Sequence, residues 1–297
     1  MTGETGIPVE VAPRVRRILA PNPSPMTYQG TNSYLIGRDR VVVVDPGPND
    51  PKHLEAILAA LGPKERITHI LVTHAHLDHS PLARALSAET AAPVLGYGSA
   101  TAGRSRRMQE LAASGDVGGG EGLDHDFEPD IRLADGAVVS QDSWSIKALH
   151  TPGHLGNHMC FAFDDILFTG DLIMGWATSL ISPPDGDLRD FLKSCRKVQD
   201  HAFGVFLPGH GDPVTTPAER TSDLINHRLS RERQVVDALS QGPQSVSELA
   251  RSIYSDTDPT LLPAAERNVL AHVLALLEDG RVAAEPEPSI HARFRLL

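Results

Sequence analysis

One heptapeptide constrains this chain more than any other feature: directly after the apolar residues 70–72 comes Thr73-His74-Ala75-His76-Leu77-Asp78-His79. The apolar run predicts a buried strand that ends where the histidines begin. Imidazole and carboxylate groups suit Zn²⁺, and alternate residues leaving a strand end can converge on one ion. Asp78 and His79 fall where the chain turns into a helix, so they aim at a neighbouring position. The segment therefore predicts a metal site at the end of a strand.

Three further elements of the same kind follow in order: Thr151-Pro152-Gly153-His154, Thr169-Gly170-Asp171 and Pro208-Gly209-His210-Gly211. Each places a metal-type ligand in a glycine-bearing turn just after an apolar run. One histidine-rich heptapeptide could be a polar loop without metal, but that interpretation does not account for the whole ordered set. The set offers seven ligand residues, too many for one tetrahedral ion. The sequence therefore predicts two metal ions held by five histidines and two aspartates.

Short apolar runs alternate with helical patterns through the first part of the chain. The runs predict strands at residues 33–36, 40–44, 70–72, 94–96, 145–149, 159–163, 166–168 and 205–207. Apolar residues at helical spacing predict helices within 54–61 and over 187–198. This alternation is typical of a layered α/β fold rather than a helical bundle.

The pattern becomes helical after a break near Thr216 and Pro217. Three amphipathic helices are predicted, followed by two short apolar runs that form a hairpin: residues 226–239, 247–254, 264–277, 282–283 and 294–296. Three helices and a hairpin predict a winged helix. We therefore expect a catalytic domain over residues 1–216 and a winged-helix-like domain over 217–297. The apolar helical faces need a cover, so the tail is expected to pack on the first domain; a homodimer is compatible with this.

Residues 103–126 are polar and include Gly118, Gly119 and Gly120, which predicts a mobile surface excursion. A small basic cluster lies in this segment and consists of Arg104, Arg106 and Arg107. A solvated face is the default interpretation of such a cluster. The alternative is a clamp for an anionic group of the substrate.

The order HxHxDH, then His, Asp and His, resembles the metallo-β-lactamase superfamily, and the match runs through the whole first domain. The resemblance implies an αββα sandwich. It also implies which residues share a metal: His74, His76 and His154 on the first ion, Asp78, His79 and His210 on the second, and Asp171 bridging both.

The same resemblance touches residues outside the ligand set. Asp45, at the end of the valine-rich run, matches an early aspartate of the family that is structural or supports a ligand. His158 has a family counterpart, and support of a ligand and simple packing are both open for it. Trp176 and Thr178 follow the Asp171 turn, where they are expected to line the substrate pocket or only to form its wall.

A narrower resemblance links the chain to the β-lactamase-like protein 2 family. It is carried by residues 23–35, with the sequence PSPMTYQGTNSYL, and by Asn226-His227-Arg228 followed by Arg231-Glu232-Arg233-Gln234. That family also ends in a winged helix, and some of its members are single-stranded RNA endonucleases. The resemblance covers nearly the full length of the chain.

The predicted site implies a hydrolytic mechanism. Two cations about 3.5–4 Å apart lower the pKa of a shared water from about 15.7 towards 7, which provides a metal-bridging hydroxide as the nucleophile. Asp78 and His79 are the predicted catalytic residues, because they hold the second metal and Asp78 can orient that nucleophile. The expected cofactors are two Zn²⁺ ions per chain, with Mn²⁺ or iron as alternatives. Neither Cys160 nor Cys195 lies in a motif, so thiol catalysis is excluded.

Two substrates fit this chemistry: a small ester, thioester or lactone, and single-stranded RNA. A redox iron protein fits less well, because diiron relatives usually carry a carboxylate where this chain has His76. The formal net charge is -11, and residues 217–297 hold nine Lys and Arg against twelve Asp and Glu. Phosphate backbones bind largely through cationic side chains, so we expect a small acyl substrate rather than RNA.

Composition also bears on location. The first twenty residues lack the apolar core of a signal peptide, and no run of eighteen apolar residues occurs in the chain. Two free thiols suit a reducing compartment. We therefore expect a cytoplasmic protein without a membrane partner.

Overall fold

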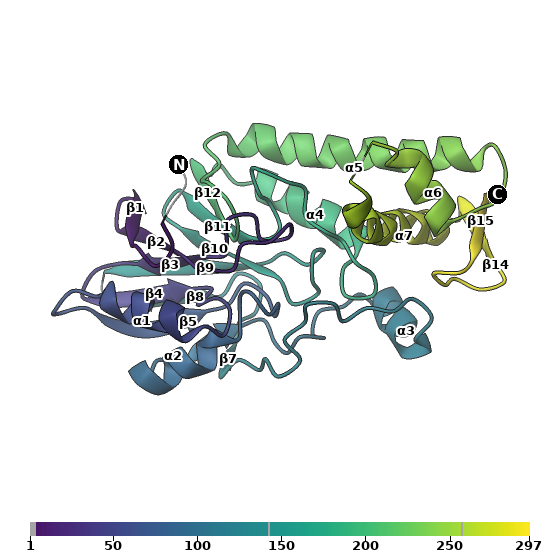
Figure 1. The fold of residues 1–297 in the computed structure, drawn as a ribbon. Helices are drawn as coiled ribbons and strands as arrows, with labels where there is room; N and C mark the ends of the chain where they lie inside the picture. Colours follow the sequence, from purple (N-terminus) through teal and green to yellow (C-terminus); the bar gives the residue numbers. More distant parts are fainter. Residues whose placement is uncertain (1–3, 142, 257) are drawn as a thin grey trace.

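The computed structural model describes residues 4–141, 143–256 and 258–297. Two β-sheets lie face to face with helices outside them, and a helical tail packs at one end (Figure 1). Among the described residues, no helix is both long and apolar enough to cross a membrane.

The first sheet contains seven strands in the order of the sequence. They are β1 Val9–Ala12, β2 Val15–Leu19, β3 Asn32–Ile36, β4 Arg40–Val44, β5 Arg66–Leu71, β6 Val94–Gly96 and β7 Ile131–Arg132. The pairs from β1 to β4 are antiparallel, and those from β4 to β7 are parallel. The parallel strands are linked by crossovers that include α1 (Pro51–Ala59) and α2 (Leu82–Thr90). Parallel pairing brings the carboxyl ends of β4 and β5 to one edge, where the metal motif begins.

The second sheet has the strand order β12-β11-β10-β9-β8. Its strands are β8 Val138–Gln141, β9 Trp144–His150, β10 Met159–Phe163, β11 Ile166–Gly170 and β12 Val205–Pro208, with α4 at Leu188–Gln199. The valines of β4 explain the layering, because Val42 and Val44 face Phe161 and Phe168 between the sheets while Val41 and Val43 face α1 and α2. Helix α4 covers the outer face of the second sheet. This arrangement confirms the predicted αββα sandwich.

The tail consists of three helices and a three-stranded sheet. Its elements are α5 Pro217–Leu239, β13 Gln244–Ser245, α6 Val246–Ile253, η1 Pro259–Leu261, α7 Leu262–Glu278, β14 Val282–Glu285 and β15 Arg293–Leu296. The predicted winged helix is therefore confirmed. Helix α5 begins nine residues before the predicted start at Asn226, because Pro217 occupies its first turn, where a missing N–H costs nothing. The predicted boundary at residues 216 and 217 coincides with this helix start and remains a prediction.

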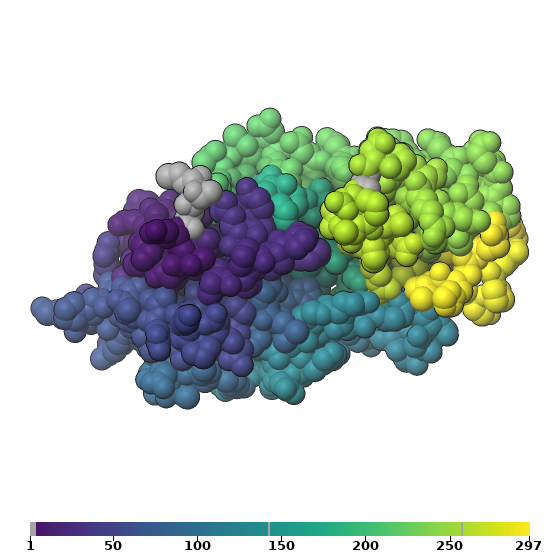
Figure 2. All heavy atoms as spheres, in the orientation of Figure 1, coloured from purple at the N-terminus to yellow at the C-terminus, as the bar shows by residue number. Residues whose placement is uncertain are grey.

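The tail and the first domain share one hydrophobic core. Leu224 and Ile225 of α5 and Ala271 and Ala275 of α7 lie in the same buried cluster as Phe191, Leu192 and Cys195 of α4. The predicted packing of the tail on the first domain is therefore confirmed. Figure 2 shows the purple N-terminal part and the yellow-green tail meeting at the molecular surface.

Residues 103–126 lie mostly at the surface, as their composition predicts, and their mobility remains a prediction. The segment is nevertheless anchored to the tail, because it contains helix α3 (Arg106–Ser114), whose Met108 and Leu111 are buried together with Val117 in the core of the tail. The sequence did not predict this anchoring, because the covering elements come much later in the chain. In Figure 1, α3 lies on the tail side of the molecule, apart from α1 and α2.

Candidate metal centre

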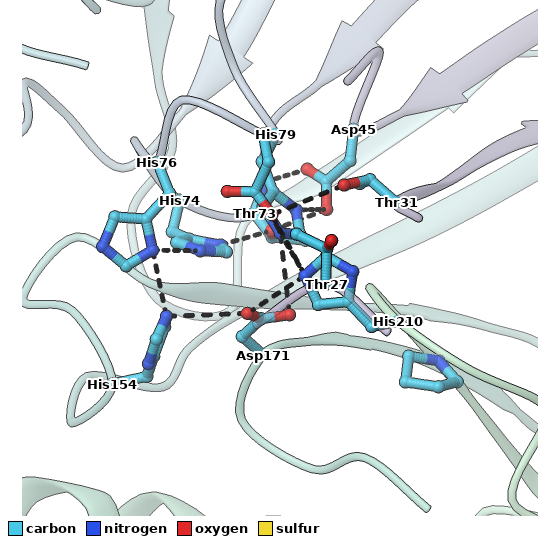
Figure 3. A network of polar contacts seen from close by, with 12 residues as sticks. Thr27, Thr31, Asp45, Thr73, His74, His76, His79, His154, Asp171 and His210 are labelled. Carbon is cyan, nitrogen blue, oxygen red and sulfur yellow. Dashed lines mark hydrogen bonds and ion pairs between the residues drawn. The ribbon is translucent and has the colours of Figure 1, made fainter. Parts of the chain in front are cut away.

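The seven predicted ligand residues meet at one edge of the sandwich. His74 and His76 follow β5, and Asp78 and His79 precede α2, while the other three leave the second sheet after β9, β11 and β12: His154, Asp171 and His210. Strands β11 and β12 are parallel, so their carboxyl ends bring Asp171 and His210 together. Figure 3 shows the side chains of six of them pointing toward one another: His74, His76, His79, His154, Asp171 and His210.

His74, His76 and His154 form the first group. The Nδ1 atom of His76 lies 2.9 Å from Nε2 of His74 and 3.0 Å from Nε2 of His154. Burial lowers the pKa of all three imidazoles, for His76 to about 3. They are therefore neutral at physiological pH, the form in which imidazole binds a metal. Their convergent nitrogens can hold one ion.

Asp78, His79 and His210 form the second group. Oδ2 of Asp78 lies 3.1 Å from Nε2 of His210 and 3.3 Å from Nε2 of His79, and the two Nε2 atoms are 3.3 Å apart. Burial lowers the pKa of His210, but Asp171 and Asp78 outweigh burial and raise that pKa to about 9. The two carboxylates thus favour positive charge at this position, and a metal cation would supply it.

Asp171 lies between the two groups. Its Oδ2 atom is 3.7 Å from Nε2 of His154 and 3.4 Å from Nε2 of His210, and its Oδ1 atom is 3.6 Å from Nε2 of His79. Oδ1 is buried and has no hydrogen-bond partner among the described residues. A buried carboxylate oxygen without a partner is costly unless a cation binds it. Asp171 therefore fits the bridging position that the resemblance implies.

Because Gly209 has no side chain, the space beside Asp171 stays open. A Cβ at this position would lie 2.6 Å from Oδ1 of Asp171 and 2.6 Å from Cε1 of His79. The donor set of imidazoles and carboxylates suits Zn²⁺, and Mn²⁺ or iron can use the same donors. The residues therefore fit a dinuclear site, and the identity of the metal remains a prediction.

Asp45 supports both groups of ligands. One of its oxygens, Oδ2, accepts hydrogen bonds from Nδ1 of His79 at 2.9 Å and from Oγ1 of Thr73 at 2.7 Å. Oγ1 of Thr73 in turn lies 2.9 Å from Nδ1 of His74. These contacts leave Nε2 of both histidines free to face the metals, as is usual for metal-binding histidines. Of the two roles that the resemblance implies for Asp45, support of a ligand describes its position.

His158 holds the turn that carries Asp171. Its Nε2 atom accepts a hydrogen bond from the backbone N–H of Asp171 at 3.2 Å, and its Nδ1 atom lies 3.0 Å from Oγ1 of Thr151. Both ring nitrogens are engaged, so neither faces a metal. Of the two predicted roles, support of a ligand describes this position better than packing alone.

The arginine cluster does not reach the metal site. Arg104 is mostly buried and forms an ion pair with Asp185, while Arg106 and Arg107 contact Glu110 near the surface. None of the three is among the described residues that line the cavity over the metals. Arg106 fits the predicted solvated face, but Arg104 does not, and the structure does not support the clamp.

A cavity of about 820 Å³ opens over the metal centre. Trp176 and Thr178 are in its lining, as predicted, and Trp176 stacks on Tyr28 with ring centroids 4.9 Å apart. The tail contributes residues that the sequence did not predict for the site: His227, Arg231, Tyr254, Leu261 and Asn268. The resemblance of residues 226–234 to a known family was the one signal for His227 and Arg231, and no feature of the sequence indicated the other three.

We expect elemental analysis of the pure protein to find about two metal ions per chain, mainly zinc, because seven ligand residues converge and Asp171 lies near histidines of both groups. A strong chelator should abolish hydrolysis, and Zn²⁺ or Mn²⁺ should restore it. The exposed His201 offers a control, since His201→Ala should retain the full metal content. A metal count near zero in protein that has been supplied with excess Zn²⁺ would contradict the assignment.

Two models of known families match this chain, one over the region that holds the ligand residues and one over the tail. The family model described as "Metallo-beta-lactamase superfamily" matches residues 26–210, and "Beta-lactamase associated winged helix domain" matches 245–289. The "Beta-lactamase-like protein 2 homolog" of Drosophila melanogaster is 31% identical over 278 residues, covering 90% of this chain and 89% of that protein.

Two further similarities bear on fold and chemistry. The "Atrochrysone carboxyl ACP thioesterase" of Aspergillus fumigatus is 31% identical over 237 residues, which cover 77% of this chain and 66% of that protein. A crystal structure of a beta-lactamase domain protein from Burkholderia ambifaria superposes with a TM-score of 0.80 at 22% identity. It covers 99% of this chain and 94% of that chain.

Proposed function

The chain belongs to the metallo-beta-lactamase superfamily and is a metal-dependent hydrolase; from that premise we propose that its substrate is a small ester, thioester or lactone. Among these, we favour a thioester. The observation that carries the proposal is the cavity over the metal centre, whose size and lining suit a compact, largely apolar molecule.

The lining of the cavity is mainly apolar and includes Met26, Leu77, Met174, Trp176, Leu180 and Leu261. Its volume of about 820 Å³ is within the usual range of small-molecule sites. Arg231 is the one Lys or Arg among its described lining residues. A phosphate backbone binds mainly through several cationic side chains, so this lining favours an acyl substrate.

The residues divide the work of hydrolysis between them. His74, His76 and His154 would hold one cation, Asp78, His79 and His210 the other, and Asp171 both. When bound, two cations provide hydroxide at neutral pH and offset negative charge on the substrate oxygen. Asp78 lines the cavity and can accept a hydrogen bond from the attacking water, which orients it. Burial raises the pKa of both Cys160 and Cys195 to about 12, so neither thiol is an alternative nucleophile.

The similarity to a fungal protein named as an acyl carrier thioesterase supports the choice of a thioester. The similarity extends over 77% of this chain, so the same reaction class is a consistent proposal for it.

Single-stranded RNA is the second candidate substrate. The similarity to the β-lactamase-like protein 2 homolog covers 90% of the chain, and metals can themselves neutralise a scissile phosphate. The net negative charge of residues 217–297 argues against RNA as the substrate. So does the lining of the cavity, where Arg231 is the one Lys or Arg among the described residues. RNA is therefore the alternative that the experiment must include.

We expect turnover of a short-chain thioester and no cleavage of labelled single-stranded RNA, both measured with the zinc-loaded protein. The assays should be run at about 0.02 M and about 0.15 M salt, because adventitious RNA binding weakens steeply over this range. His76→Ala is the control that separates the chain's own activity from a contaminant. Zinc-dependent RNA cleavage that survives the higher salt, without thioester or lactone turnover, would overturn the proposal.

A further inference from the structure

Arg231 of α5 is held in the wall of the cavity by the tail itself. Its guanidinium carbon lies 4.3 Å from the ring centroid of Tyr254, and Nη1 donates hydrogen bonds to Ile253 O at 3.2 Å and to Gln234 Oε1 at 2.8 Å. These contacts fix the position of the cation before any ligand arrives. They also leave Nε and Nη2 without a hydrogen bond to the described residues.

The charge of Arg231 is not balanced by a carboxylate of the described chain. Its neighbour Glu232 is engaged by Arg189 and Arg281 instead. One turn before Arg231, His227 also lines the cavity, and its buried Nδ1 has no hydrogen-bond partner among the described residues. A fixed cation with free donors on a largely apolar wall of the cavity is suited to bind an anion.

We propose that Arg231, with His227 beside it, forms a subsite for one anionic group of the substrate, a carboxylate or a phosphate. The proposal rests on the acyl hydrolase function proposed above. Guanidinium binds carboxylates and phosphates through paired hydrogen bonds, and the free Nε and Nη2 donors of Arg231 suit this geometry. The anion would belong either to the acyl group or to the leaving group.

Four thioesters tell these sources apart: valeryl and glutaryl groups, each on N-acetylcysteamine and on coenzyme A. The glutaryl group adds a carboxylate to the acyl side, and coenzyme A adds phosphates to the leaving group. Arg231→Gln removes the charge at similar length, and Arg233→Gln, two residues on and exposed, is the matched control. We expect Arg231→Gln to raise KM about 10- to 100-fold for thioesters with the anion at one of these positions. Valeryl-N-acetylcysteamine should change less than about threefold, as should all four substrates with Arg233→Gln. Equal changes for all four thioesters, or none, would overturn the subsite.

A binding measurement separates failure of the subsite from failure of the proposed reaction. Thioether analogues lack the carbonyl and cannot be hydrolysed, so calorimetry can compare pentyl and 4-carboxybutyl thioethers of N-acetylcysteamine. If no thioester is turned over but Arg231→Gln weakens only the carboxylated thioether, the subsite stands and the proposed reaction fails. If thioesters are hydrolysed and Arg231→Gln alters neither turnover nor binding, the subsite fails and the reaction stands.

A second, independent observation concerns the three residues Ser179, Leu180 and Ile181. The carbonyl oxygen of Leu180 accepts a hydrogen bond from Nδ1 of His154 at 2.7 Å. The residues on either side of Leu180 are held by the tail. Nη2 of Arg228 donates to Ser179 O, and the backbone N–H of Ile181 donates to Oδ1 of Asn268 at 3.2 Å.

Arg228 and Asn268 are joined to each other as well, since Nη1 of Arg228 donates to Oδ1 of Asn268 at 3.0 Å. Arg228 is 1% exposed and lies over the ring of Phe191 at 5.4 Å, without an ion pair to any described carboxylate. Burial of a guanidinium without a carboxylate partner costs free energy, and the hydrogen bonds of Arg228 must offset that cost. Outside the tail, the hydrogen bonds of Arg228 among the described residues go to Ser179, next to the residue that orients His154.

We infer that Arg228 and Asn268 are positioning residues for the metal centre, because they fix the carbonyl that orients His154. The tail would then complete the first metal group without touching the metal. Loss of a partner that orients a metal-binding histidine typically lowers metal affinity about 10- to 100-fold.

Asn268→Leu removes the shared acceptor at similar volume, and Asn268→Asp keeps it. Competition with a chromophoric chelator should show about tenfold weaker binding of one metal in Asn268→Leu and near-normal binding in Asn268→Asp. With Co²⁺ in place of zinc, the visible spectrum should change in Asn268→Leu while the thermal unfolding midpoint moves by only a few degrees. If Asn268→Leu does not fold, Arg228→Lys gives the second test, since lysine replaces the two donating nitrogens Nη1 and Nη2 by a single Nζ. Folded variants that bind both metals like the parent chain would overturn the inference.

Discussion

Replacing Asp171 by alanine is expected to abolish hydrolysis and to weaken binding of both metals. Its two oxygens lie within 3.7 Å of histidine nitrogens from both ligand groups, so its loss should disturb both metal positions. Loss of several kcal/mol of transition-state stabilisation corresponds to a rate decrease on the order of 10³. Elemental analysis and thioester turnover, measured on the same samples, check both parts of the expectation.

His210→Ala provides the contrast with Asp171→Ala. His210 contacts Asp78, His79 and Asp171 but no histidine of the first group in the hydrogen bonds and ion pairs of the described residues. The His210→Ala variant should therefore lose mainly the second metal and keep about one metal per chain. Asp126→Ala, at an exposed aspartate, is the control and should keep both metals and full activity. Retention of two tightly bound metals in Asp171→Ala would show that this carboxylate is not the bridge.

The ligand residues could be predicted because each is a distinctive residue type at a strand end. Asp45 was indicated only by the family resemblance, and the structure supplies the physical reason, since β4 and β5 are parallel neighbours whose ends meet. The groups that orient His154 and His210 could not be predicted. They are the backbone carbonyls of Leu180 and Gly30, and a carbonyl oxygen has no signature in the amino-acid sequence.

The role of the tail was only half predictable. Its amphipathic helices indicated that it needed a partner, and the shared core with α4 confirms this. Sequence periodicity gives the face of a helix but not the surface that covers it. The burial of Met108, Leu111 and Val117 under the tail, and the reach of Arg228 to Ser179, depend on contacts between positions far apart in the chain.

A chain that ends at Thr216 is expected to lose its compact fold and its activity. Removing the tail affects buried residues of α3, α4 and the segment after α3 that lie in cores shared with it: Met108, Leu111, Val117, Phe191, Leu192 and Cys195. Complete burial of one such side chain contributes about 1.5–3 kcal/mol. If half of their burial comes from the tail, the loss is on the order of 5 kcal/mol, which is comparable with the stability of a whole domain.

The shortened chain should therefore elute as aggregate on size exclusion, bind the dye ANS and lack near-ultraviolet circular dichroism, all of which report loosened packing. Leu224→Ala in the full-length chain is the milder version, because Leu224 of α5 is 1% exposed in the shared core. It should cost about 2–5 kcal/mol of unfolding free energy while leaving the substrate cavity intact. A shortened chain that stays soluble, monomeric and fully active would show that the tail is a separate module. It would then also remove the reason to place Arg228 and Asn268 in the support of His154, because both belong to the part removed.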